Sequence, residues 1–553
     1  MCGSAQKKLE IPLFLWLSRN VAKADLPTTR KGFRVKTITR KLLAKRKRRI
    51  ERRLRKIQWA EQDRPMLSGV NIHYEVSDKA RGLACGGIGA MHLLAIKSGL
   101  ASAIDRNLHL LKRHVPYFES DHVLSIAYNL LAGGTCLQDL GHRRTDEVYL
   151  DGLGAERIPA PTTEGDFCRR FTAADIETLL ETINQVRLGV WRQQPAGFFE
   201  QATIDADGTL AMTYGQCKEG MDISYKGQWG YHPLLVSLAN TGEPLYLVNR
   251  SGNRPSHEGA GERFDQAIGL CRRAGFKKIL LRGDTDFTQT DKLDGWDSDG
   301  AGFIFGIDAM ANLVQIANDL PERAWKKLVR RAKYEVRTQE RARPENVKER
   351  IVRQREFENI RLTSEDVAEF EYQPSKCRQP YRVVVVRKNL TREKGETALF
   401  DEVRYFFYIT NRWELPEDEV VPQINGRCNQ ENLIEQLKNG ARAMEMPVGD
   451  LVSNWAYMVM ASLAWTLKAW LALSLPETGR WAEKYQTQKQ SLLRMEFKKF
   501  LNVMMRLPCQ VVRTGRRIVY RLMSWNPWQE VLLRGVATLR ERVVGVVHYP
   551  LRC

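Results

Sequence analysis

The sequence lacks any paired arrangement of cysteines. Its ten cysteines are scattered singly along 553 residues, and no Cys-x-x-Cys occurs. Disulfide frameworks and structural zinc sites both need cysteines at regular short spacings. We therefore expect a reduced, cytosolic protein without a structural zinc site.

A long uninterrupted apolar run is also missing. The longest apolar stretch covers residues 451–476 and contains Asn454 and Lys468. A membrane-spanning helix needs about 20 predominantly apolar residues and tolerates charge poorly. The stretch therefore predicts a buried helix and no membrane partner. The seven apolar residues 11–17 are too short for the core of a signal peptide.

Acidic residues are scarce at both ends of the chain. Residues 1–57 hold 19 Lys/Arg against 3 Asp/Glu, and residues 494–553 hold 12 against 3. Since the formal net charge is +21, the middle of the chain is slightly acidic, at −4. Basic ends around an acidic centre favour a protein whose arms bind polyphosphate while its centre keeps carboxylates for metal. A disordered, solvated basic tail is the alternative for the N-terminal arm.

The length predicts several structural units. Hydrophobic periodicity and turn signals divide the chain into a basic N-terminal arm, a helical region, the first part of an α/β core, an insertion, the last part of the core, and a basic helical C-terminal region. Their ranges are 1–66, 67–200, 201–310, 311–412, 413–475 and 476–553.

Within the helical region, residues 120–131 form a helix that Gly133-Gly134 would end, and a short second helix would begin near Cys136. Arg143 and Arg144 lie at the end of this second helix. The outline is that of a helix-turn-helix, although many helical hairpins share it without touching DNA. A capping box at Thr172 to Asp175 opens the next helix.

Five segments after Glu200 are typical of strands, because they are short and rich in β-branched, aromatic and Leu residues. They are residues 202–207, 231–239, 244–250, 278–282 and 303–308, with a helix at 258–274 between the third and the fourth. This order matches a ribonuclease H-like α/β fold. Residues 311–412 interrupt it, first with charged helical sequence to about Arg361 and then with strands, so we expect a β-containing insertion before the last core helix, at 426–440.

The strand pattern predicts where three aspartates lie. Asp205 and Asp207 alternate with apolar residues on the first strand, so both lie on the same face. Asp284 follows the apolar run of the fourth strand, at the edge where α/β sheets bind ligands. If the first and fourth strands are neighbours, Asp207 and Asp284 lie side by side and repel each other unless a cation joins them.

A third carboxylate is expected from the last core helix. Arg427, Glu431, Glu435 and Lys438 fall on one side of that helix at steps of four, four and three residues. Glu431 can then face the aspartates while Arg427 and Lys438 approach phosphate. Hard carboxylate oxygens select Mg²⁺ or Mn²⁺, and two such ions support in-line phosphoryl transfer without a nucleophilic side chain. Singly, such residues are more often helix caps or solvated salt bridges.

Several segments together resemble the bacterial insertion-sequence DDE transposases of the Tyr-Arg-Glu-Lys type. They are Ile204-Asp-Ala-Asp207-Gly-Thr209, Gly230-Tyr-His-Pro-Leu234, Arg282-Gly-Asp284-Thr-Asp-Phe287 and Arg427-Cys-Asn-Gln-Glu431, with Gly154 to Ile158, Pro161 to Thr163 and Asp166 to Phe171 before them. The resemblance covers roughly residues 70–545.

The resemblance implies that Asp207, Asp284 and Glu431 bind the metal ions and that Arg427 and Lys438 complete the signature. Asp205, on the same strand face as Asp207, is a substitute candidate for a metal ligand. It also implies a β-rich insertion before the last helix. The chain departs from the pattern at two positions. Ile424 stands where the signature has Tyr, and Asp286 adds an acid beside Asp284.

Further DNA contacts are expected at basic and aromatic positions. Trp413 could hold a flipped base, for which a core-packing Trp is the alternative. Backbone contacts are expected from six arginines: Arg143, Arg144, Arg169, Arg170, Arg516 and Arg517.

We therefore expect a cytosolic, nucleoid-associated bacterial transposase with two Mg²⁺ or Mn²⁺ ions. It would bind the terminal inverted repeats of its element, pair two ends as a homodimer, cut the strands and join them to target DNA. Two alternatives stay open: a ribonuclease H-like nuclease or resolvase that cuts without joining, and a catalytically inactive, transposase-derived DNA-binding regulator.

Overall fold

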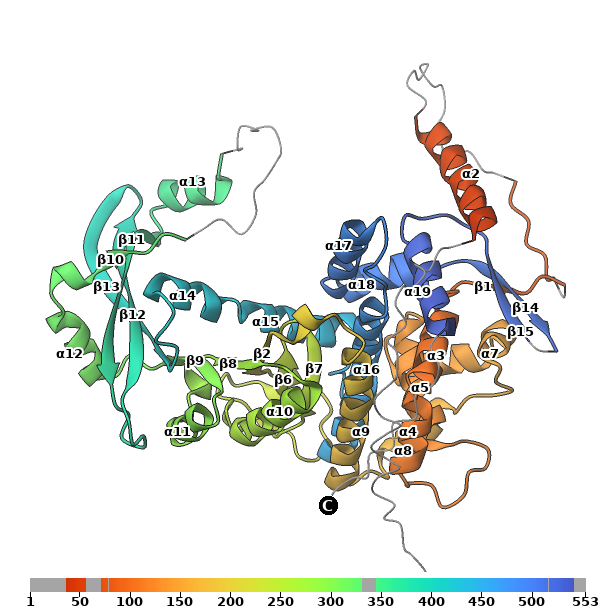
Figure 1. Cartoon of the computed structure of the whole chain (residues 1–553), viewed down its shortest axis with the longest axis horizontal. Helices are drawn as coiled ribbons and strands as arrows, with labels where there is room; N and C mark the ends of the chain where they lie inside the picture. The colour runs from red at the N-terminus through yellow and green to blue at the C-terminus, as the bar shows by residue number, and fades with distance from the viewer. Residues whose placement is uncertain (1–35, 56–70, 78, 331–344, 516, 542–553) are drawn as a thin grey trace, which may run out of the picture.

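The computed structural model describes residues 36–55, 71–77, 79–330, 345–515 and 517–541. These residues form a mixed α/β structure in which a large sheet lies beside a helical half (Figure 1). The large sheet has nine strands in the order β10-β11-β12-β13-β9-β8-β2-β6-β7.

The five predicted core strands are confirmed and form one end of this sheet. They are β2 (Gln201–Gly208), β6 (Leu234–Leu238), β7 (Glu243–Val248), β8 (Lys278–Gly283) and β9 (Gly302–Ile307). Strand β2 pairs in parallel with β8 and antiparallel with β6, so the first and fourth core strands are neighbours, as expected. Their apolar side chains are buried, partly under helix α10 (Ala260–Ala274), which contacts four of these strands.

A smaller sheet follows β2 directly. It has three short strands in the order β3-β5-β4, with β3 (Ala211–Met212), β4 (Asp222–Ile223) and β5 (Trp229–Tyr231). Strand β5 leads into β6, so this small sheet is attached at the end of β2 that carries Asp207.

The insertion contains more strand than expected. After α12 (Ala311–Asp319), β10 (Lys326–Lys327) and α13 (Val347–Gln354) come three long strands, β11 (Glu358–Tyr372), β12 (Tyr381–Lys394) and β13 (Thr397–Thr410). The expectation of helix to about Arg361 is wrong, because β11 begins at Glu358. The start of β11 is charged and exposed, and its extended conformation is fixed by antiparallel pairing with β12.

The insertion strands continue the core sheet. Strand β13 pairs antiparallel with β9, from Phe407↔Ile307 to Thr410↔Ile304. Helix α14 (Glu417–Asn425) then packs against β11 and β9, and α15 (Cys428–Glu435) follows and packs against β2. A π-helical turn at Gln436–Gly440 completes the helix expected at 426–440.

The helical half is built around α16 (Leu451–Leu473). Its most apolar window is long enough to cross a membrane by composition, but that window is entirely buried, as predicted for this stretch. It contacts β7, α9 (Ala173–Trp191) and three further helices of the N-terminal half. The helices before α9 are α3 (Ile88–Lys97), α4 (Leu100–Asn107), α5 (Glu119–Leu131), α6 (Leu140–Arg144), α7 (Glu147–Leu153) and α8 (Pro161–Cys168).

The local signals in this half behave as predicted. Helix α5 stops before Gly133, whose φ is +92°, and Thr172 forms the expected capping box with Asp175. Helix α5 is almost wholly buried, and α6 has only five residues. The eight cysteines in the described part of the chain are all free.

The C-terminal region was expected to be helical, and this expectation is wrong for part of it. Helices α17 (Ala482–Leu493), α18 (Phe497–Phe500) and α19 (Gln529–Glu541) enclose a hairpin of β14 (Cys509–Thr514) and β15 (Arg517–Leu522). Burial alternates along both strands, because period-two packing on β1 (Gly82–Leu83) and on helix α7 outweighs the helical propensity.

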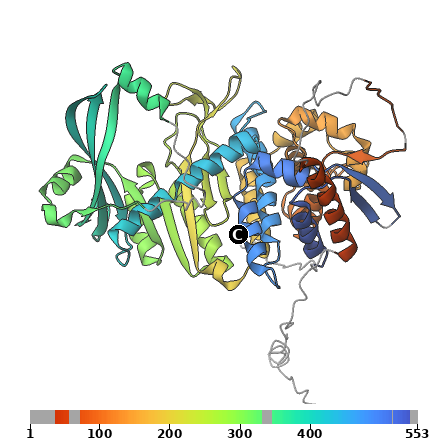
Figure 2. The same cartoon turned by 90° about the horizontal axis from the view of Figure 1, so that it is seen from above.

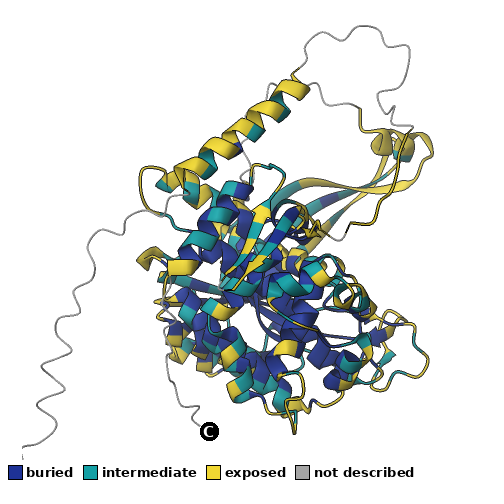
Figure 3. Ribbon diagram, turned by 90° about the vertical axis from the view of Figure 1, so that its right-hand side faces the viewer, coloured by how far each residue is buried: buried dark blue, intermediate teal, exposed yellow. Residues whose placement is uncertain are grey.

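Part of the basic N-terminal arm forms a helix, α2 (Thr37–Leu54). It lies on the outside of the helical half, beside the C-terminal elements (Figures 1 and 2). Most of its surface is exposed, in contrast to the buried centre of the molecule (Figure 3). The rest of the basic arm, including residues 1–35, lies outside the described residues.

Candidate active site

The site is built first from the ends of two parallel strands. In the register of β2 and β8, Asp205 is level with Arg282. Asp207 and Asp284 each lie two residues further along, so the two aspartates stand at the same height on neighbouring chains. The backbone N–H of Asp286 donates to the Asp284 carboxylate at 3.2 Å. The sequence-based expectation that Asp207 and Asp284 lie side by side agrees with this geometry.

The electrostatics at Asp207 link three acidic residues. Burial, then the negative charge of Asp284 and, to a smaller extent, that of Glu431 together raise the pKa of Asp207 to about 7, against the opposing charge of the Arg427 guanidinium. The pKa of Asp284 is also raised, chiefly by burial and opposed by Arg427. Carboxylates that resist ionisation because they repel one another form a site that favours a cation.

Helix α15 presents Glu431 to this edge. Its inner face carries Leu433 and Ile434, which are buried, while Glu431 is exposed. Gln430 anchors the helix to β6, because its Nε2 donates to the Leu235 carbonyl at 3.0 Å and its Oε1 accepts from the Ser237 hydroxyl.

Sequence reasoning did not identify Gln430. It is 2% exposed and falls in the i, i+3, i+4, i+7 row with Leu433, Ile434 and Leu437. A polar residue within an apolar helical row is the signal that could have found it, since buried amides require hydrogen-bond partners.

Arg427 lies among the acidic residues. Its Nη1 is 3.7 Å from Oδ2 of Asp284, and its charge lowers the pKa of Asp205, Asp207 and Asp284. Its side chain is about one quarter exposed. Arg427 thus neutralises part of the charge at the strand ends while keeping access to solvent.

Asp205 is occupied by an ion pair. Arg282 donates from Nε to Oδ1 of Asp205 at 2.7 Å and from Nη2 to Oδ2 at 2.8 Å, and both side chains are buried. Arg282 also donates to the Gln423 carbonyl on α14 at 2.6 Å. Since both oxygens of Asp205 are bound, its suggested role as a substitute ligand is not supported, and Asp207 is the free aspartate of β2.

The close approach of Arg282 to α14 requires a glycine. A Cβ on Gly426 would lie 2.4 Å from Nη1 of Arg282. Arg282 therefore ties β8, β2 and the chain that leads into α15 together at one point.

Lys438 reaches back to the loop that follows β2. Its Nζ donates to the Leu210 carbonyl at 2.7 Å and lies 3.4 Å from the Thr209 hydroxyl. Burial lowers its pKa. In this structure Lys438 holds the loop beyond Asp207, rather than standing free for the phosphate contact expected from the sequence.

Histidine 232 lies directly beside the strand end. Its Nδ1 is 2.8 Å from the Arg254 carbonyl, and a Cβ on Gly208 would meet its Nε2 at 3.1 Å. Burial lowers the pKa of His232. A neutral imidazole next to Asp207 fits a structural role, with one ring nitrogen bound to the backbone.

Trp413, which precedes α14, and Ile424, which lies within it, differ in exposure. Ile424 is buried against Leu280 and Ile304, so the residue that replaces the signature Tyr packs in the core. Trp413 is 52% exposed, which excludes the alternative of a core-packing Trp.

The arginines expected to contact DNA have varied surroundings. Arg143 donates to the Ala132 carbonyl at 3.0 Å and closes the end of α5, while Arg144 donates to the Ile158 carbonyl at 3.1 Å. Arg169 is exposed and pairs with Asp166 at 2.7 Å. Arg170 and Arg517 are exposed, and Arg516 lies outside the described residues.

The donor chemistry of the site fits a hard divalent cation, because Asp207, Asp284 and Glu431 offer carboxylate oxygens and little else. In the described part of the chain, no three His, Cys, Asp or Glu side chains are already gathered into a ligand set.

A mixed sheet with acids at two adjacent strand ends and a third acid on the following helix is typical of enzymes that act on phosphodiesters with bound cations. Residues 84–544 match the family described as "Transposase DDE domain group 1". Because the match covers well over half of the sequence, the chain belongs to this family and is a DDE transposase. Such enzymes generally use divalent metal ions.

Other comparisons add little. No curated protein matches the chain. Among solved structures, a cryo-EM structure of a piggyBac transposase synaptic complex with hairpin DNA is similar, with 11% sequence identity and a TM-score of 0.33. The similarity covers 77% of this chain and 80% of that one.

Proposed function

We propose that this DDE transposase cuts and joins the DNA strands of a bacterial insertion sequence, and that it is of the Tyr-Arg-Glu-Lys type. The observation that carries the proposal is the raised pKa of Asp207, about 7, to which both Asp284 and Glu431 contribute. Acids at the end of β8 and on α15 thus both act electrostatically on the Asp207 carboxylate of β2. The core strand order β7-β6-β2-β8-β9, with its parallel and antiparallel pairs, supports a ribonuclease H-like core.

Asp207, Asp284 and Glu431 would hold two Mg²⁺ or Mn²⁺ ions. When bound, such ions activate a water or 3′-hydroxyl and stabilise the leaving oxygen. The chain's own residues prepare the site: Arg427 balances the acids, and Lys438 fixes the loop beyond Asp207. Exposed Arg427 atoms are suited to contact the phosphate backbone.

The remaining regions would bind the DNA and pair its ends. Residues 67–200 and the basic ends would bind the terminal inverted repeats, and a homodimer would pair two ends in the bacterial cytosol. Residues 201–310 and 413–475 form the proposed core, interrupted by the insertion at 311–412. Exposed Trp413, near the start of the last core segment, is suited to stack on a base.

The test uses duplexes that carry the DNA flanking the reading frame on both sides, incubated with the full chain and Mg²⁺. We expect strand cleavage and joining by the wild type. Asp207→Asn, Asp284→Asn and Glu431→Gln should each lose roughly three powers of ten in rate, since each removes several kcal/mol of charge stabilisation. DNA binding should persist. Glu435→Gln, one helical turn from Glu431, is the matched control and should cut normally.

The outcomes separate the alternatives. Cleavage without joining would indicate a nuclease or resolvase. If Asp207→Asn left the function of the protein in the cell unchanged, the protein would be a DNA-binding regulator without catalysis.

A further inference from the structure

Helix α2 is docked on the C-terminal end of the chain by one face. Leu43 is buried, and Arg46 Nη1 donates to the carbonyls of Leu522 at 2.8 Å and Ser524 at 3.1 Å. Arg40 pairs with Glu530 of α19 at 3.4 Å. Helix α2 is therefore held by the end of β15, the residues that follow it and α19, and lies beside these C-terminal elements (Figures 1 and 2).

The opposite face of α2 carries a row of cations, the α2 stripe, formed by Lys41, Lys45, Arg48 and Arg52. At about 100° per residue, these four lie roughly 140–200° around the helix from Leu43. The row is about 16 Å long. All four residues are exposed.

The structure does not neutralise the α2 stripe. The single acid of α2, Glu51, lies off the row and pairs with Lys47 at 3.6 Å. In the described part of the chain, the only polar contact of a stripe side chain joins Arg48 to the Ala44 carbonyl of the same helix, at 3.4 Å.

This charge is unfavourable for the helix alone. Like charges three or four residues apart destabilise a helix, and α2 has neither an acid in its first turn nor a side-chain cap. The helix is instead held by its docked face. A row of cations kept in place against its own repulsion is complementary to a polyanion with regularly spaced charges.

The hairpin beside α2 extends the same kind of surface. Arg517 and Arg521 are four residues apart on β15, so both lie on its outward face, and both are exposed. Leu522, which follows, is the residue whose carbonyl binds Arg46.

We propose that the α2 stripe and the outward face of β15 together bind the phosphate backbone of duplex DNA. The occupant is duplex DNA because the cations form a straight row on a rigid helix and the enzyme is a transposase. Helix α2 lies before residue 84, outside the segment that matches the family. The inference rests on the proposed function only for its choice of partner.

The test measures the affinity of the full chain for a random-sequence duplex of 30 base pairs, by fluorescence anisotropy at several salt concentrations. A chelator is present, so that neither metal nor cleavage takes part. Each lost phosphate contact lowers the slope of log K against log salt by about 0.9. The variant K41Q/K45Q/R48Q/R52Q should therefore lose up to about 3.6 from that slope and bind at least roughly tenfold more weakly.

Matched variants control for net charge and for folding. K327Q/K348Q/K376Q/K484Q removes four exposed charges from regions to which no DNA contact is assigned, and should lose much less slope. K41R/K45R/R48K/R52K keeps the charges and should bind like the wild type. Equal losses in the two glutamine variants, or full DNA affinity in the α2 variant, would overturn the proposal. The proposal would also be overturned if the α2 glutamine variant lost binding to anionic vesicles but kept its affinity for DNA.

Failure here is distinguishable from failure of the proposed function. The salt slope is measured with a chelator present, so it tests the α2 stripe whether or not the chain cuts DNA. Asp207→Asn should bind the duplex with the wild-type affinity and salt slope and should cut no flanking DNA with Mg²⁺.

Discussion

Arg282 is not one of the acidic residues of the candidate site, yet it joins β8 to β2 and to α14. It neutralises buried Asp205 on β2 and binds the Gln423 carbonyl on α14. Only a planar guanidinium can make the two parallel bonds to Asp205 and a third bond to a carbonyl.

Substitutions at Arg282 should therefore be costly. Arg282→Gln leaves Asp205 buried and unpaired, so we expect a loss of about 3–5 kcal/mol in the free energy of unfolding. Arg282→Lys keeps the positive charge but loses the pair of parallel hydrogen bonds to Asp205. Its free energy of unfolding should lie between those of Arg282→Gln and the wild type. Urea denaturation measures both. A double variant with Asp205→Asn should regain part of the loss, and a loss unchanged by that second substitution would contradict the pairing.

The residue scale also shows what the sequence could predict of the site. Asp207 and Asp284 were predictable because each belongs to an apolar strand whose end is easily located. Glu431 was predictable from the spacing to Arg427 and Lys438 and from the family resemblance. The ion pair that occupies Asp205 was not predictable, because it depends on the register between β2 and β8, which no local pattern encodes.

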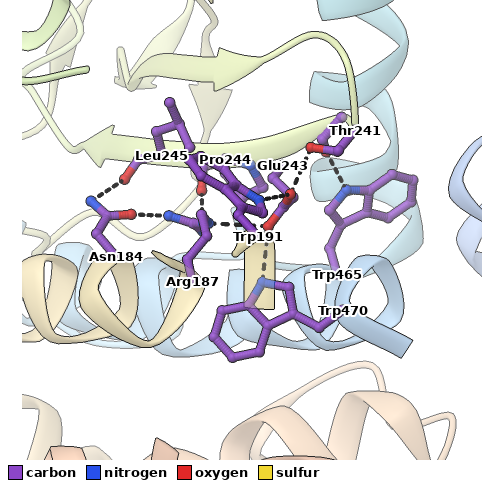
Figure 4. A network of polar contacts seen from close by, with 10 residues as sticks. Asn184, Arg187, Trp191, Thr241, Glu243, Pro244, Leu245, Trp465 and Trp470 are labelled. Carbon is purple, nitrogen blue, oxygen red and sulfur yellow. Dashed lines mark hydrogen bonds and ion pairs between the residues drawn. The ribbon is translucent and has the colours of Figure 1, made fainter. Parts of the chain in front are cut away.

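At the scale of elements, a buried polar network joins the sheet to the helical half (Figure 4). Glu243, at the start of β7, accepts from Arg187 and Trp191 of α9 and from Trp470 of α16, at 2.9–3.1 Å. The Thr241 hydroxyl donates to it at 2.6 Å. One carboxylate therefore fixes two helices on the edge strand of the core.

Removing this carboxylate should loosen the joint between the two halves. In Glu243→Ala the Arg187 charge remains buried without its main partner, so we expect a loss of about 3–5 kcal/mol, measured by chemical denaturation. Arg187→Met with Glu243→Leu removes both charges and should be less destabilised than the single variant. If the double variant is no more stable than Glu243→Ala, the charge is not the cause.

Element prediction from the sequence succeeded where burial and periodicity agree, as in β8 and α16. It failed at β11, whose first residues are charged and exposed and become a strand only through pairing with β12. It also failed at β14 and β15, which are short and basic, since their partner β1 lies more than 400 residues away in the chain. Long-range pairing overrides local propensity in these strands.

At the scale of the whole molecule, α16 carries a buried lysine. Lys468 is 1% exposed, its Nζ donates to the Leu493 carbonyl at 2.9 Å, and it lies 3.6 Å from the centre of the Trp465 ring. Burial lowers its pKa from 10.5 to about 7. The unfolded chain therefore holds a proton between about pH 7 and pH 10.5 that the folded chain has lost.

Stability should rise with pH in this window. The slope contributed by Lys468 is up to about 1.4 kcal/mol per pH unit, and it vanishes below pH 7, where both states are protonated. Lys468→Met should remove this contribution, whereas Lys484→Met on the exposed side of α17 should keep it. Denaturation from pH 6 to pH 9 measures the difference, and parallel curves for the wild type and Lys468→Met would contradict the assignment.

The nine-stranded sheet has a mechanical consequence. Strands β13 and β9 are joined by backbone hydrogen bonds, so the inserted strands and the strand that leads to Asp284 belong to one stiff, twisted ribbon. Because backbone hydrogen bonds link the inserted strands to β9 and β9 to β8, we expect the insertion and the strand end next to Asp284 to move together as one body.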